Sequence, residues 1–263
     1  MVDDGSRQAA PEVIREWIRC LPLNIVRQPH AGISAARNRG IQFSKGSTLL
    51  FVDADCRLQT NCLTALKSTL AASPQHDYFQ LHLIGGGAGI VGRSEELRLI
   101  TLQSQLLQTN GCIRYLNTAG FAIRRTRVNI EEGLFDAAAI RAEDTLLLAK
   151  LMRSGTLPFF AADAIVQHVV TLSVTKCLRK EARSACLERR TYDTIASKGV
   201  SIRVTHSERL GMLLSMWKTS ERRSIGRSAW ILLTARQALR LMVRLIIDVS
   251  GIRPPSNVSA GSH

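Results

Sequence analysis

The segment "KGSTLLFVDADC" (residues 45–56) places an apolar run directly before two carboxylates. The run from Leu49 to Val52 is typical of a buried β-strand, and Asp53 and Asp55 follow it with one alanine between them. Alternation along an extended segment puts the two carboxylates on the same side. Because ligands of open α/β sheets bind beyond the carboxyl ends of the strands, the segment predicts a ligand site at this edge.

The chemistry of the acidic pair favours a hard divalent cation. Magnesium and manganese ions need only one or two protein carboxylates when phosphate oxygens complete their coordination shell. Asp-x-Asp alone is a weak signal, since Asp55 also suits a capping position ahead of the helix expected over residues 61–72. The pair therefore predicts a Mn²⁺ or Mg²⁺ site only together with the motifs around it.

Composition and charge limit the classes of partner. The chain has 263 residues, of which 45% are hydrophobic and 5% aromatic, and this suits one large aliphatic-packed domain with an appendage. A formal net charge of +14 favours an anionic partner, such as a phosphorylated substrate, acidic lipid or nucleic acid. With few aromatics and no nucleic-acid-binding module, we expect no nucleic-acid partner. Six cysteines without CxxC or metal-ligand spacing indicate reduced thiols and a cytoplasmic protein.

Strand-like and helix-like segments alternate along the chain. This alternation predicts an α/β domain with a mainly parallel, twisted sheet. We expect "GGGAG" (85–89) to be a flexible joint, because it lacks the GK[ST] of a phosphate-binding loop. The expected strands include 23–26, 47–55, 78–84, 121–125 and 164–170, and the expected helices include 32–46, 61–72, 95–108 and 142–153.

Four motifs occur in a recognisable order. "DDGS" (3–6), "GISAARNRGIQFSKG" (32–46) and "LLFVDADCRLQTNCL" (49–63) are followed by a long block (116–155), in which "GLFD" precedes a Glu-Asp pair that opens a helix. In this order and spacing the chain resembles the inverting family-2 glycosyltransferases of the GT-A fold, over roughly residues 2–170. The resemblance implies a GT-A-like, three-layer α/β fold.

The resemblance implies donor-side roles for three residues. Asp3 or Asp4 of "DDGS" would receive the nucleobase or ribose of a nucleotide sugar, and Arg37 of "ARN" would face the nucleotide or its diphosphate. The structural alternatives are a turn-forming Asx pair for the two acids and an ion pair with a strand-end acid for the arginine.

The same resemblance implies a metal site that carries the donor's diphosphate. Asp53 would contact both the ribose and the metal, and Asp55 would bind the cation directly. His168, in "AIVQHVV", matches a histidine that completes the metal site in some relatives. The alternative for His168 is a hydrogen-bonded core residue, which is common for a lone histidine on an apolar strand.

Asp144 matches the catalytic base of the family. An inverting transfer needs one carboxylate on the acceptor side to take the proton of the attacking hydroxyl, while the cation stabilises the departing diphosphate. A helix N-terminal carboxylate is the structural alternative for Asp144, and Glu143 would orient it or be solvated. The implied function is metal-dependent sugar transfer to a saccharide or lipid-linked acceptor, in cell-surface polysaccharide or glycolipid synthesis.

The chain departs from the family pattern in two places. The family has a first strand and a helix before DDGS, whereas this chain has Met1 and Val2, so we expect an N-terminally truncated fold with unpaired peptide groups on two neighbouring strands. No Gln-x-x-Arg-Trp box follows Asp144, which argues against polymer synthesis. An inactive remnant that binds a membrane or another anion is therefore the alternative to an active transferase.

The carboxyl end changes to basic helix. We expect a catalytic domain over residues 1–205, a basic amphipathic helical region over 206–253 and a disordered tail over 254–263. Arg236, Arg240 and Arg244 recur every fourth residue on one helix face. Such a helix suits either a membrane interface, with arginines toward anionic headgroups, or packing against the catalytic domain. The first alternative predicts a peripheral protein on the inner face of the cell membrane.

Overall fold

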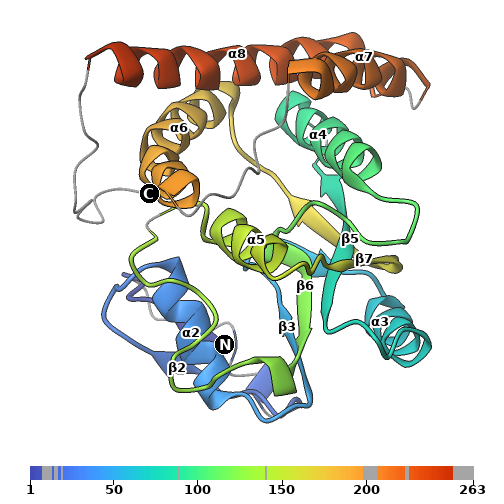
Figure 1. Ribbon diagram of the computed structural model, residues 1–263, viewed down its shortest axis with the longest axis vertical. Helices are drawn as coiled ribbons and strands as arrows, with labels where there is room; N and C mark the ends of the chain where they lie inside the picture. The colour runs from blue at the N-terminus through green and yellow to red at the C-terminus, as the bar shows by residue number, and fades with distance from the viewer. Residues whose placement is uncertain are drawn as a thin grey trace.

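A five-stranded sheet forms the centre of the chain in the computed structural model (Figure 1). The structure describes residues 1–7, 14, 17–18, 20–87, 89–139, 141–197, 206–222 and 225–250. The strand order is β3-β6-β5-β7-β4. The bounds are β3 Thr48–Phe51, β4 Cys56–Leu58, β5 Tyr78–Gly86, β6 Phe121–Arg124 and β7 Phe159–Val169.

The directions of these strands make the sheet mixed. β5 and β7 are parallel, whereas β3 with β6, β5 with β6 and β4 with β7 are antiparallel. The expectation of a mainly parallel sheet is therefore wrong for the described strands. β6 runs antiparallel to both of its neighbours, and β4, which follows β3 after residues 52–55, runs antiparallel to β7 at the sheet edge.

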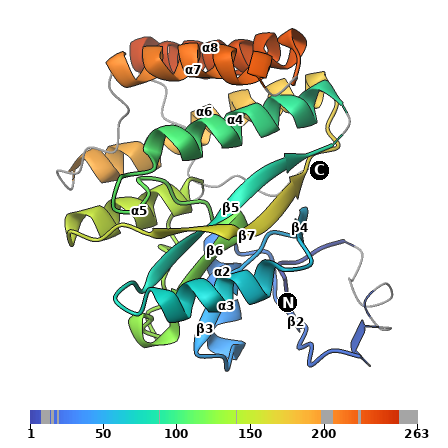
Figure 2. The same ribbon diagram turned by 90° about the vertical axis from the view of Figure 1, so that its right-hand side faces the viewer.

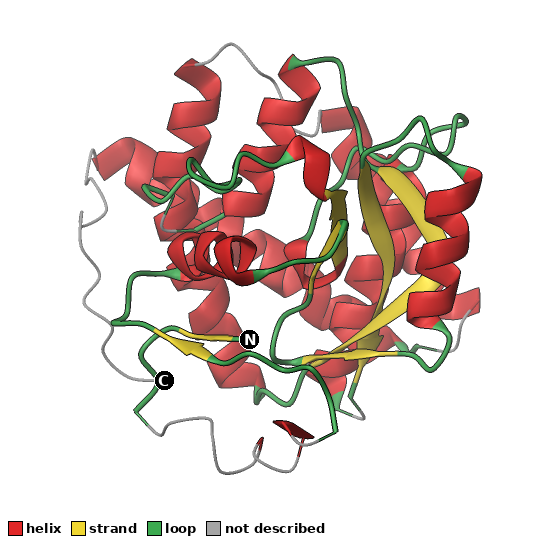
Figure 3. Cartoon of the chain, turned by 90° about the horizontal axis from the view of Figure 1, so that it is seen from below, coloured by secondary structure: helices red, strands yellow, loops and turns green. Residues whose placement is uncertain are grey.

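A second, smaller sheet carries the "DDGS" segment. β1 (Val2–Asp3) runs parallel to β2 (Val26–Arg27) and packs beside α2 (Ile33–Phe43). Figure 3 shows this pair of strands apart from the main sheet. Among the described residues β1 pairs only with β2, and β3 pairs only with β6. The donor-side motifs are thus divided between two sheets.

Helices cover both faces of the main sheet (Figure 2). α3 (Cys62–Ala72) packs on β7, and α4 (Ile90–Leu106) packs on β5. α5 (Glu143–Arg153) and α2 enclose a second part of the core, in which Ile41, Phe121 and Leu147 meet. This arrangement of helix, sheet and helix gives the expected three layers.

Three helices follow β7 and pack on the layers around the sheet. α6 is Val174–Ser197, α7 is His206–Arg222 and α8 is Arg227–Ser250. α8 lies across α4 and α6 (Figure 1), and Met216 and Leu233 share a buried cluster with Leu97 of α4. None of the described helices combines the length and hydropathy needed to span a bilayer. The expected tail over 254–263 lies outside the described residues.

The side chains of Arg236, Arg240 and Arg244 on α8 face the protein. Arg236 is 6% exposed and bonds to Glu95 and Glu181, while Arg240 and Arg244 bond to Glu188. Acidic residues on α4 and α6 therefore decide which side of α8 packs inward. Of the two alternatives for this helix, the structure shows packing against the rest of the chain. In this arrangement the three arginines do not point toward lipid headgroups.

Candidate active site

The chain leaves β3 through a turn that carries both acids of the Asp-x-Asp pair. The amide of Cys56 donates to the carbonyl of Asp53 at 3.0 Å, and β3 ends at Phe51. The expectation that the strand continues through Asp55, so that alternation orients the carboxylates, is therefore wrong. The turn forms because β4 reverses direction to pair with β7.

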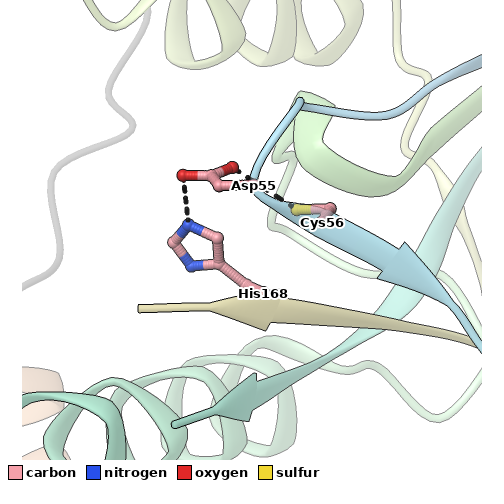
Figure 4. A group of neighbouring side chains, drawn as sticks. All are labelled: Asp55, Cys56 and His168. Atoms are coloured by element: carbon pink, nitrogen blue, oxygen red, sulfur yellow. Dashed lines mark hydrogen bonds and ion pairs between the residues drawn. The ribbon is translucent and has the colours of Figure 1, made fainter. Parts of the chain in front are cut away.

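The pairing of β4 with β7 brings a carboxylate, a thiol and an imidazole together. Cys56 lies opposite His168 in the antiparallel register. The ligand atoms of Asp55, Cys56 and His168 all lie within 4.8 Å of one another (Figure 4). Two predicted metal ligands, Asp55 and His168, are thus adjacent. The third predicted ligand, Asp53, is not a member of this group and bonds instead to Arg37.

The donor atoms of this group fit a divalent cation. Carboxylate oxygen and imidazole nitrogen both bind Mn²⁺, and sulfur adds a softer donor that suits Zn²⁺. No motif of the sequence predicts a role for Cys56. Its only signal was the position next to Asp55, because the register with His168 becomes visible only in the folded sheet.

Hydrogen bonding sets the charges of the group. His168 Nε2 lies 3.2 Å from Asp55 Oδ2, and its Nδ1 lies 3.5 Å from Glu95 Oε1. The bonds to Asp55 and then Glu95 raise the pKa of His168 to about 9, and the same histidine lowers the pKa of Asp55. Burial, followed by the charges of Asp55 and Asp53, raises the pKa of Cys56 to about 12. A cation that binds here therefore has to displace the imidazolium proton.

Arg37 joins the end of β3 to the start of α5. Its Nη2 donates to Asp53 Oδ1 at 2.8 Å, and its Nη1 donates to Glu143. The side chain is 10% exposed and lies with its guanidinium 5.5 Å from the ring centroid of Phe135, in the "GLFD" turn. The ion pair with a strand-end acid, one of the two interpretations of Arg37, is thus present. Contact of Arg37 with a nucleotide stays a prediction.

Asp144 follows Glu143 in the first turn of α5. Burial, and after it the charge of Glu143, raises the pKa of Asp144 to about 7. The amide of Thr145 donates to Asp144 Oδ1 at 2.7 Å. Burial also raises the pKa of Tyr115. The negative charges of Asp144 and Glu95 raise the same pKa further. A carboxyl group with a pKa near neutrality is well matched to accept a proton in catalysis.

Backbone amides hold the two acids of "DDGS". Asp4 accepts from the amides of Ala31 and Gly32, each at 2.9 Å, just before α2 begins. Asp3 accepts from the amide of Ser6 at 2.9 Å. The turn-forming alternative is thus present for Asp3, whereas Asp4 bonds to the segment that precedes α2. Contact of Asp3 or Asp4 with a nucleoside stays a prediction.

Comparison with known families decides the classification. The model of glycosyl transferase family 2 matches residues 1–132. The chain belongs to glycosyl transferase family 2. Two curated proteins with similar sequences are named as glycosyltransferases. They are EpsH of Bacillus subtilis (strain 168), 32% identical, and YibD of Escherichia coli (strain K12), 38% identical, each over 56 residues. Each match covers 21% of this family-2 chain and only 16% of the relative's length.

Solved structures share the fold of this family-2 member. The mannosyltransferase PcManGT from Pyrobaculum calidifontis, in complex with GDP-Man and Mn²⁺, aligns with a TM-score of 0.60 and 14% identity, over 94% of this chain and 76% of that one. S. aureus TarS 1–349 in complex with UDP aligns with a TM-score of 0.52 and 17% identity, over 95% and 80%. At such identity the likeness concerns the fold alone, and it confirms the expected GT-A-like architecture.

The bridge made by Arg37 can be tested by Arg37→Lys. Lysine keeps the positive charge but lacks the planar fork that serves two carboxylates at once, so either Asp53 or Glu143 loses its partner. We expect the free energy of unfolding to fall by about 1–3 kcal/mol, measured by urea denaturation. Arg39→Lys, an exposed position on the same helix, is the control. Equal stability of the two variants would contradict the bridge.

The raised pKa of Asp144 predicts a pH-dependent gain from Asp144→Asn. The pKa rises from the ordinary 3.8 to about 7 on folding, so the carboxyl group costs stability that grows as pH rises from 4 through 7. We expect the variant to have the higher Tm at pH 8, at about 2–4 °C for each kcal/mol removed, and this gain to shrink at pH 5. The exposed Asp163→Asn is the matched control. A Tm difference that does not vary with pH would contradict the assignment.

Proposed function

We propose that this protein transfers a sugar from a nucleotide-sugar donor to an acceptor hydroxyl, with inversion and with Mn²⁺ or Mg²⁺. The adjacency of Asp55 and His168 at the exit of β3 carries this proposal. The solved relatives support it, since PcManGT was determined with GDP-Man and Mn²⁺ and TarS with UDP-GlcNAc. Family membership supports the transferase class.

Residues at the ends of β1 and β3 form the donor side. Asp55 Oδ2 and His168 Nε2 would hold the cation, with Cys56 Sγ next to them. The bound cation would neutralise charge that develops on the departing diphosphate. Asp53 and Arg37 lie beside this group and are suited to the ribose and phosphates. Asp3 and Asp4 are assigned to the nucleoside, at the far end of the donor.

Asp144 supplies the base on the acceptor side. Its carboxylate takes the proton of the acceptor hydroxyl while that oxygen bonds to the anomeric carbon and the bond from this carbon to the diphosphate oxygen breaks. One displacement inverts the anomeric configuration and needs no covalent intermediate with the protein. Burial, and after it the charge of Glu143, keeps the pKa of Asp144 high, and Arg37 holds Glu143 in place. The acceptor is proposed to be a saccharide or lipid-linked sugar of the cell surface.

Calorimetric titration of GDP and UDP, with Mn²⁺ or with EDTA, tests the donor side. We expect binding that requires Mn²⁺ and that Asp55→Ala weakens at least about tenfold, or about 1.4 kcal/mol, because the direct carboxylate ligand is lost. Asp163→Ala, an exposed carboxylate on β7, serves as the control. Binding that is equal in EDTA and unaffected by Asp55→Ala would favour the alternative, an inactive anion-binding remnant.

We further propose that α8 contacts an anionic membrane with its outer face. The last turns of the helix expose five large apolar side chains, Leu241, Met242, Leu245, Ile246 and Val249, with exposures from 44% to 88%. The occupant is assigned as anionic lipid because the net charge of +14 complements an acidic bilayer. Such contact would place the protein on the cytoplasmic face of the membrane, near a lipid-linked acceptor.

Vesicle sedimentation tests this contact. We expect the protein to sediment with vesicles rich in phosphatidylglycerol and not with phosphatidylcholine vesicles, and more salt to weaken binding. The double variant Leu245→Glu/Ile246→Glu should stay in the supernatant, whereas Leu63→Glu, at an exposed apolar position on α3, should still bind. Equal sedimentation of both variants would contradict the proposal, and a dimer lost only in the α8 variant would assign this face to a second copy.

A further inference from the structure

Glu95 is a buried carboxylate directly behind the predicted metal ligand His168. It lies on α4, is 5% exposed and faces the imidazole from the side opposite Asp55. Two arginines surround it: Arg98 Nη2 lies 2.6 Å from Glu95 Oε1, and Arg236 Nη2 lies 3.1 Å from Glu95 Oε2. The imidazole ring is therefore held between two carboxylates, one at each nitrogen.

Gly85 makes this approach of α4 feasible. In the sheet Gly85 lies opposite His168, as partners on β5 and β7. A Cβ atom at Gly85 would lie 2.4 Å from the backbone of Glu96, which no real packing tolerates. The glycine-rich segment that looked like a flexible joint thus lets the backbone of α4 lie directly against β5, next to Glu95. This is a packing reason for the glycine that is independent of the ion pairs.

The contacts continue from Glu95 into the carboxyl-terminal helices. Arg236 of α8 also bonds to Glu181 of α6 at 2.6 Å, and Glu181 bonds to Arg240 at 2.8 Å. Arg240 and Arg244 then share Glu188. A continuous series of ion pairs therefore runs from the turn after β3, through His168 and Glu95, to the middle of α8.

We propose that Glu95 is a positioning residue for His168, and that Arg236 makes α8 part of the support of the metal site. Glu95 Oε1, 3.5 Å from Nδ1, favours a proton on that nitrogen, which leaves the Nε2 lone pair directed toward the cation. Arg236 and Arg98 fix the carboxylate of Glu95 in turn. The inference rests on the proposed role of His168 as a metal ligand and extends it to residues outside the family's motifs.

The matched pair Glu95→Gln and Glu188→Gln separates positioning from general stability. Both residues are buried carboxylates in ion pairs with two arginines, but only Glu95 lies against His168. We expect both variants to lower the urea midpoint and only Glu95→Gln to weaken Mn²⁺ binding, by about 10–100-fold. Free Mn²⁺ is measured by electron paramagnetic resonance at a pH where wild type binds.

A second variant covers the case in which Glu95→Gln does not fold. Glu95→Asp keeps the charge that the two arginines need but shortens the side chain away from His168, so we expect weakened Mn²⁺ binding with a smaller loss of stability. Unchanged Mn²⁺ affinity in the folded Glu95 variants, with affinity lost in Asp55→Ala, would overturn this inference and leave the proposed function standing. Wild-type protein that binds no Mn²⁺ would overturn both.

Discussion

A single guanidinium sets the spacing of the candidate active site. Arg37 bonds at once to Asp53, where β3 ends, and to Glu143, where α5 begins, and Phe135 covers it from solvent. Because the guanidinium is planar and rigid, it fixes the distance between these two elements as a flexible ammonium cannot. Asp55, proposed as a ligand of the cation, follows Asp53 in the chain, and Asp144, proposed as the base, follows Glu143. The proposed donor and acceptor sides are therefore joined through one nearly buried side chain.

Alternating charge organises the rest of the site. Asp55, His168 and Glu95 follow one another as acid, imidazole and acid, and arginines from α4 and α8 lie behind them. The position between the carboxylates favours positive charge, which the imidazolium supplies when no metal is bound. The same electrostatic preference suits a divalent ion. Few groups in this series are free to relax, because most of them are shared between two partners.

Local motifs predicted much of the site, and long-range pairing decided the rest. The apolar run before Asp53 and the motif order singled out Arg37, Asp55 and Asp144 from sequence. Asp55 and Asp144 lie close to the start of a regular element, and Arg37 lies within α2. The strand directions were not predictable, because the antiparallel placement of β6 and β4 depends on pairing with strands far along the chain. Cys56 and Glu95 were missed, since their places depend on a strand register and on the close approach of a helix. The fourfold spacing of the α8 arginines indicated one face, but only the acids of α4 and α6 determine where it points.

The shared packing of α7 and α8 has a practical consequence for anyone who wants a minimal version of this enzyme. A chain ending near residue 205 would lack Met216 and Leu233, and so would bare the apolar side of α4 around Leu97 to water. In such a chain Glu95 would also have one arginine partner instead of two. Such a fragment would be less soluble and would hold the proposed metal ligands less rigidly. Any recombinant form meant for enzymology should therefore include α7 and α8.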